Sequence, residues 1–169
     1  SCLTPSTAIT CPYTDSYRGN VTELRATGEA YFNETQTRCT VWPLLDERKN
    51  KVYKNDKDMM EVAMELSKTN CQQQTGGPFG TAIFEYDPQT KESKLFSIGV
   101  NRVVPCSNST LHGEMTAIQF GQQKIRDFSF AMAGAKISKE YHLYTSCAPC
   151  CQCLGGVLWS GVSAIPTLN

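Results

Sequence analysis

Residues 143–153 read LYTSCAPCCQC, so a short apolar segment runs directly into Pro149 and a cluster of four cysteines. We predict a strand over 141–145 and a helix opened by Pro149, because proline's missing N–H costs nothing at a first helical position. Cys150 and Cys153 are three residues apart, so their sulfurs share one face of that first turn. The positive end of the helix dipole stabilises thiolates there. The segment therefore predicts a strand–helix corner that presents two thiolates together.

A second helix, predicted over residues 112–126, begins at His112. A catalytic zinc takes three protein ligands and leaves one position for water. If the two helix starts converge, His112, Cys150 and Cys153 supply that set as candidate ligands of Zn²⁺. Glu114 lies two residues past His112. This spacing is poor for binding the same ion along a helix, so we predict that Glu114 is the catalytic residue that moves protons.

The remaining pattern alternates helices and strands. Residues 56–70 carry an apolar helical face, while 79–86 and 94–101 read as two strands joined by a turn at 87–90. Residues 162–165 are predicted to be a fourth strand. A strand–helix–strand order favours parallel pairing with helices that cover the sheet. The fold class predicted from these elements is an α/β sandwich with a mixed sheet.

The domain boundary is predicted from composition. Residues 1–50 are rich in Thr, Ser and Cys and lack a long periodic stretch, so we expect an irregular, cysteine-containing N-terminal arm. The chemistry-bearing motifs all follow, which assigns 51–169 to the zinc domain.

The charge balance bears on the class of partner. Sixteen basic residues meet sixteen acidic ones, whereas a polynucleotide-binding domain usually carries a basic excess that contacts phosphates. No apolar run approaches the roughly 18 residues that span a membrane. The composition therefore favours a small-molecule substrate over nucleic acid, and predicts no membrane span.

Two features predict a secreted protein or one in the secretory-pathway lumen. Glycosylation sequons begin at Asn20, Asn33 and Asn108. The chain also has nine cysteines, and five of these are scattered as disulfide cysteines tend to be: Cys2, Cys11, Cys39, Cys71 and Cys106. The alternative is a cytosolic protein with buried free thiols.

His112-Gly113-Glu114 followed by Pro149-Cys150-Cys151-Gln152-Cys153 matches H-x-E followed by P-C-x-x-C, the zinc deaminase signature. From residue 76 to about 165, roughly half of its length, the chain resembles the cytidine deaminase-like superfamily. It is most similar to the branch with guanine deaminase, fungal cytosine deaminase and tRNA adenosine deaminase. The GGPFG run at 76–80 resembles the entrance segment of guanine deaminases. The TLHGE run at 110–114 resembles fungal cytosine deaminase.

The resemblance implies a three-layer α/β/α sandwich with a mixed, mainly parallel sheet. It also implies that Asn101, Phe79, Gly113 and Ala148 bind the substrate; the alternative for Phe79 is that it packs in the core. Asn101 lies eleven positions before His112, and its amide can donate to and accept from a base; the alternative is that it caps a turn. The superfamily continues with a further strand and helices, so the domain is expected to be truncated, continued in another chain or completed differently.

The predicted function is zinc-dependent hydrolytic deamination of a free nucleobase or nucleoside, of guanine or cytosine type. A homo-oligomer is expected by analogy. One alternative is a polynucleotide-directed deaminase or secreted deaminase toxin. Another is a non-catalytic binding protein stabilised by zinc or disulfides, since Ala148 replaces the superfamily's usual glutamate.

Five further side chains are predicted to have structural roles. Trp42 and Trp159 are predicted to have packing roles rather than to stack on bases, and His142 to lie on a strand surface. The flanking Cys147 and Cys151 are predicted to be disulfide partners or buried thiols.

Overall fold

The computed structural model describes residues 48, 50–104 and 108–166 of the chain. These residues form one sheet with strands in the order β1–β3–β2–β4. The strands are β1 (Val52–Tyr53), β2 (Gly80–Asp87), β3 (Glu92–Val100) and β4 (Glu140–Thr145). The helices are α5 (Asp56–Gln72), α6 (Gly113–Ile125), α7 (Phe130–Ile137) and α8 (Cys151–Ser160).

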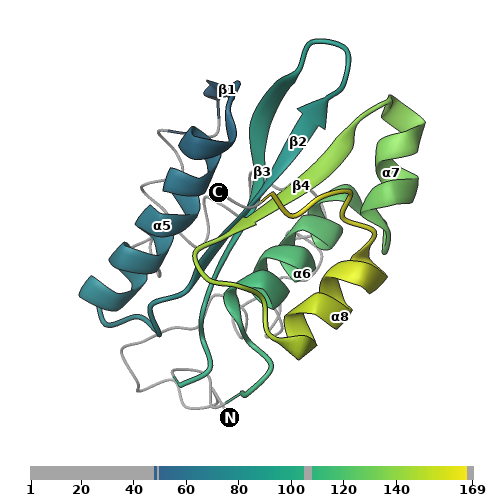
Figure 1. Cartoon of the computed structure of the whole chain (residues 1–169). Helices are drawn as coiled ribbons and strands as arrows, with labels where there is room; N and C mark the ends of the chain where they lie inside the picture. Colours follow the sequence, from purple (N-terminus) through teal and green to yellow (C-terminus); the bar gives the residue numbers. More distant parts are fainter. Residues whose placement is uncertain (1–47, 49, 105–107, 167–169) are drawn as a thin grey trace.

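Helices cover both faces of this sheet (Figure 1). On one face, Val62 and Leu66 of α5 pack in the same buried cluster as Phe84 of β2. On the other face, Ile83 of β2 shares a cluster with Val157 of α8 and with residues of α6 and α7. Successive strand residues point to opposite faces, so β2 contributes to both clusters. The predicted α/β/α sandwich is confirmed.

Strand pairing differs in one respect from the prediction. The predicted hairpin is confirmed, because β2 pairs antiparallel with β3 and the backbone N–H of Lys91 donates to the carbonyl of Asp87 across the turn. However, β2 also pairs antiparallel with β4, so the expectation of mainly parallel pairing is wrong among the described strands. The helical crossover does make β3 and β4 run in the same direction, but β2 lies between them. Parallel pairing in the described sheet is limited to one isolated bridge between His142 and Ala164. This bridge stands where a fourth full strand was predicted, at residues 162–165.

Two elements had no sequence prediction. Helix α7 is apolar on most sides and shows no polar face to mark it, although Ser129 accepts from Met132 as its N-cap. Strand β1 has two residues, too few for alternation to show. A third difference concerns α8, which begins at Cys151 with Cys150 as its N-cap, so Pro149 precedes the helix.

No helix in the described ranges is long and apolar enough to cross a membrane.

Gly99 lets the backbone of α6 approach the backbone of β3. A Cβ at this position would lie 2.1 Å from the carbonyl oxygen of Gly113 and 2.3 Å from the amide nitrogen of Ala117. These are main-chain atoms, so no side-chain rotation can relieve the overlap. Gly99 therefore fixes how closely the first turn of α6 lies on the sheet.

Gly99→Ala should lower the free energy of unfolding by about 3 kcal/mol, the upper end of the usual cost of overpacking. Denaturant titration would measure the loss. Gly155→Ala is the matched control, since a Cβ there meets nothing within 4 Å and Gly155 lies within a helix. That substitution should raise stability by roughly 0.5–1 kcal/mol. Equal stability of the two variants would contradict the assigned close approach.

Candidate active site

The start of α6 and the start of α8 bring three side chains together. His112 is the N-cap of α6 and Cys150 the N-cap of α8, and the two helices lie side by side on one face of the sheet (Figure 1). Nδ1 of His112 lies 3.5 Å from Sγ of Cys150 and 3.5 Å from Sγ of Cys153. The two sulfurs are 3.6 Å apart. The predicted convergence of the two helix starts is therefore present.

These distances fit a tetrahedral zinc ion. Zinc–sulfur bonds of about 2.3 Å and zinc–nitrogen bonds of about 2.0–2.1 Å place tetrahedral ligands about 3.6 Å apart for N···S and about 3.8 Å for S···S. All three observed separations agree within a few tenths of an ångström. Among the described His, Cys, Asp and Glu side chains, the cluster has three members. A set of three protein ligands is typical of catalytic rather than structural zinc.

The two sulfurs have different electrostatic surroundings. The backbone N–H of Cys153, in the first turn of α8, lowers the pKa of the exposed Cys150 thiol. Burial raises the pKa of Cys153, and the nearby carboxylate of Glu114 raises it further. Glu114 is 6% exposed and occupies the first turn of α6. The carboxylate therefore lies beside the cluster and is itself largely shielded from solvent, as is Cys153.

The flanking cysteines differ from the prediction. Cys147 and Cys151 are free and exposed, so neither is a disulfide partner or a buried thiol. Their side chains do not join the cluster formed with His112. Cys71, predicted to be a disulfide cysteine, is also free and exposed. The other scattered cysteines lie outside the described residues: Cys2, Cys11, Cys39 and Cys106.

Three of the predicted substrate residues converge on one carbonyl. The oxygen of Phe79 accepts from the backbone N–H of Asn101 at 3.0 Å. A Cβ at Gly113 would lie 3.5 Å from the same oxygen. Because Gly113 stands between His112 and Glu114, this contact places the loop that carries Phe79 next to the start of α6. The Phe79 side chain is 40% exposed, which leaves its ring free to contact a ligand.

Asn101 also has the turn-capping role that the sequence left open. Its side-chain oxygen accepts from the backbone N–H of Val103 at 3.2 Å. This bond uses one lone pair of the oxygen, and the amide retains its capacity to donate. Ala148 is exposed in the loop between β4 and α8. Ser146 anchors that loop through two hydrogen bonds with the backbone of Gly80, at 3.0 and 3.1 Å.

One buried polar residue near these loops, Asn70, was not predicted from the sequence. Asn70 is 0% exposed and donates to the carbonyls of Gly77 and Asn101. Its signal was available, because Asn70 continues the apolar stripe of α5 at the position four residues after Leu66. An amide at a core position of a helix requires hydrogen-bond partners from elsewhere in the fold.

The glycosylation sequons remain predictions. Thr110 donates its backbone N–H and its hydroxyl to the side-chain oxygen of Asn108, at 2.9 and 2.7 Å, so this sequon forms a tight local turn. Asn20 and Asn33 lie outside the described residues, as does Trp42. Trp159 is 88% exposed, so the prediction that it has a packing role is wrong for this chain.

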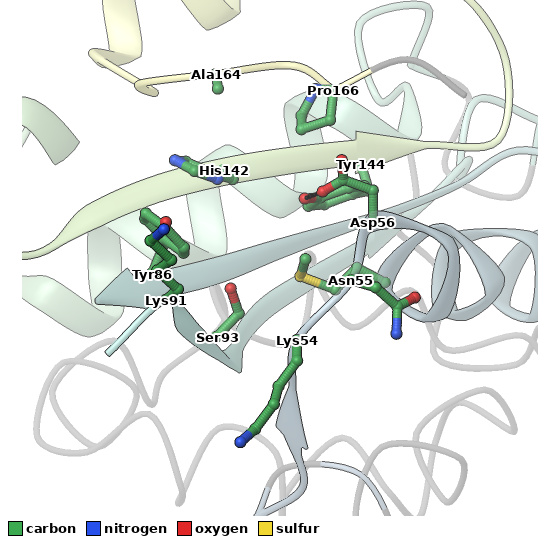
Figure 2. Close-up of a pocket in the computed structure, with 11 residues that line it drawn as sticks. Lys54, Asn55, Asp56, Tyr86, Lys91, Ser93, His142, Tyr144, Ala164 and Pro166 are labelled. Carbon is green, nitrogen blue, oxygen red and sulfur yellow. Dashed lines mark hydrogen bonds between the residues drawn. The ribbon is translucent and has the colours of Figure 1, made fainter. Parts of the chain in front are cut away.

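A cavity of about 480 Å³ lies on the α5 side of the sheet and is separate from the His–Cys cluster (Figure 2). Within its lining, the hydroxyl of Tyr144 donates to Asp56 at 2.7 Å, and the His142 ring stacks on Tyr86 with centroids 4.6 Å apart. His142 is also 3.0 Å from Glu140. The His142 side chain is 14% exposed, so it is half-buried and does not lie on the strand surface as predicted. The cavity contains none of the candidate catalytic residues.

Comparison with known proteins identifies similar sequences and structures. Residues 53–169 match the family described as the cytidine and deoxycytidylate deaminase zinc-binding region. Guanine deaminase of Bacillus subtilis (strain 168) is 30% identical over 111 residues, which is 66% of this chain and 62% of that protein. The chain therefore spans less than two thirds of this relative.

Two solved structures are similar as well. Guanine deaminase from Nitrosomonas europaea superposes with a TM-score of 0.61 and 30% identity, over 73% of this chain and 64% of that one. NE0047 in complex with 2,6-diaminopurine gives a TM-score of 0.60 and 32% identity, over 73% and 62%.

Proposed function

Because this chain belongs to the family of the cytidine and deoxycytidylate deaminase zinc-binding region, we propose that it is a zinc-dependent hydrolase that deaminates a free nucleobase or nucleoside. The base is of guanine type, a choice supported by the likeness to two guanine deaminases. The observation that carries the proposal is the cluster of His112, Cys150 and Cys153, with ligand atoms 3.5–3.6 Å apart and Glu114 beside it.

The reaction replaces an exocyclic amino group by a carbonyl oxygen and consumes one water for each ammonia released. His112, Cys150 and Cys153 would hold the zinc. When bound, zinc lowers the pKa of its coordinated water towards about 7 and so supplies a nucleophile at neutral pH. Among the described residues the cluster has three members, which supports this catalytic role over the non-catalytic alternative, since a structural zinc takes four protein ligands.

Glu114 carries the proton transfers. Its carboxylate accepts a proton from the attacking water and returns it first to the ring nitrogen beside the attacked carbon. It then moves a second proton to the departing amino group, which leaves as ammonia. The 6% exposure of Glu114 limits competing exchange with bulk water.

The loops carrying Phe79 and Asn101 orient the base. The ring of Phe79 offers an apolar face for stacking, and the Asn101 amide can donate to an acceptor on the base edge. The carbonyl of Phe79, which lies next to Gly113, ties this orientation to the first turn of α6. The base would therefore be held at a fixed distance from Glu114.

An ammonia-release screen over guanine, cytosine, adenine and their nucleosides tests the proposal, with zinc quantified on the same sample. We expect about one zinc per chain and release of one ammonia per guanine consumed, because three ligands fit a single ion. Removal of zinc by a chelator should abolish the release, and added zinc should restore it. A fully loaded protein that releases no ammonia from any of these compounds would overturn the proposed function.

A further inference from the structure

Asn70 lies in the last turn of α5 and has no exposed surface. Its side-chain NH₂ donates to the carbonyl of Gly77 at 2.8 Å and to the carbonyl of Asn101 at 3.0 Å. Its side-chain oxygen accepts from the hydroxyl of Thr75 at 2.9 Å. Both hydrogens of the amide and one acceptor site are therefore used, and each bond reaches a loop outside the helix.

The two carbonyls belong to the two loops that carry the proposed base-binding side chains. Gly77 precedes Phe79 by two residues, and the second carbonyl is that of Asn101 itself. A buried carbonyl requires a donor, and the loss of that donor costs roughly 1–3 kcal/mol. The carbonyl of Gly77 is half-buried and also accepts from the backbone N–H of Phe79 at 2.8 Å, so the Asn70 donor matters most at Asn101, which is 9% exposed. The position of the Asn101 side chain thus depends directly on the bond that its own carbonyl accepts.

The two loops pack closely against each other and against the Asn70 side chain at Gly76. A Cβ at Gly76 would lie 1.9 Å from the carbonyl oxygen of Asn101 and 2.6 Å from the side-chain nitrogen of Asn70. The loop backbone therefore lies directly against the amide. Arg102 extends the connection, since its guanidinium donates to the carbonyl of Thr75 and its backbone N–H donates to Leu111 at 2.9 Å. Leu111 immediately precedes His112.

We propose that Asn70 is a positioning residue that holds the loops of Phe79 and Asn101 in register for binding the base. This inference rests on the proposed function, because it assigns Asn70 to the binding step of that reaction. Asn70 touches neither the substrate nor the metal. It acts through two loop carbonyls and through Thr75, which are joined by Arg102 to the segment before His112.

Asn70→Asp tests the donor side of this arrangement. The substitution keeps the size of the side chain and the acceptor for Thr75, but it places oxygen against two carbonyl oxygens at about 3 Å. We expect KM for guanine to rise at least tenfold while kcat falls less than threefold, since binding of the ground state is lost. The zinc content should equal that of the natural chain. Thr75→Val removes the hydroxyl alone and should raise KM about threefold.

The split between KM and kcat separates positioning from stability. A substitution that merely unfolds part of the sample lowers the apparent kcat and leaves KM unchanged. Ser160→Ala is the matched control, because Ser160 is also buried and its hydroxyl donates to a backbone carbonyl, that of Val157, at 2.8 Å. It should lower the melting temperature and leave KM unaltered. If Asn70→Asp does not fold, Asn70→Ser provides a smaller change with the same expected direction.

The outcomes distinguish this inference from the proposed function. If the natural chain turns over guanine while the Asn70 variants and Thr75→Val have KM values within twofold of the natural value, the proposed function stands and the role of Asn70 is overturned. An equal rise of KM in Ser160→Ala would also overturn it, since the effect would then be general. A natural chain that deaminates none of the bases would overturn the proposed function, and the positioning role with it.

Discussion

Glu114→Gln should abolish deamination and leave the zinc content unchanged. Glutamine has nearly the same shape as glutamate, so the first turn of α6 should be preserved. Its amide cannot accept a proton from water, and the loss of a general acid–base typically lowers kcat by about 10²–10⁴-fold. Glu114 stands beside Cys153 in a largely buried site, where no other described carboxylate joins the cluster.

Ammonia release and zinc content, measured on the same preparation, check this expectation. Glu61→Gln is a suitable control, because Glu61 is exposed on α5. It should retain full activity. If Glu114→Gln lost zinc together with activity, Glu114 would be acting as a metal ligand. If it kept more than about a tenth of the natural rate, another group would have to carry the proton.

Cys153→Ala should remove both zinc and activity. Cys153 is 0% exposed and its sulfur lies 3.5 Å from the His112 ring nitrogen and 3.6 Å from the Cys150 sulfur. With one of three ligands lost, zinc affinity should fall by more than the roughly 10–100-fold that the loss of an outer-shell partner costs. Competition with a chromogenic chelator would measure the change.

Cys151→Ala is the matched comparison for this experiment. Cys151 is adjacent in sequence to a cluster member, but it is free, exposed and outside the cluster. Its replacement should leave zinc affinity and turnover at the natural level. Retention of zinc by Cys153→Ala, combined with loss of zinc from Cys151→Ala, would show that the cluster had been assigned to the wrong sulfurs.

The cluster of His112, Cys150 and Cys153 was predictable because its determinants are local. A spacing of three residues at a helix start places two sulfurs on one face, whatever the rest of the fold does. His112 similarly begins a helix whose apolar periodicity is visible in the sequence. Only the meeting of the two helix starts is a tertiary fact, and the signature of the two segments together indicated it.

Other features depend on packing that no local pattern records. The direction of β3 and β4 follows from their helical crossover, but the insertion of β2 between them does not. Asn70 and Asn101 are 31 residues apart, and their contact appears only when α5 lies on the sheet. Cys147 and Cys151 were wrongly predicted to be disulfide partners or buried thiols for the same reason. Their exposure depends on which side of the chain faces the cluster.

The main-chain contact at Gly99 affects how this domain tolerates sequence change. Side chains elsewhere in the interior can rotate to absorb a neighbour that gains or loses a methylene group. The backbone of Gly99 lies directly against the backbone of Gly113 and Ala117, so no side chain stands between them to adjust. We therefore expect the position of Glu114 relative to the sheet to change little when side chains of the hydrophobic core are substituted.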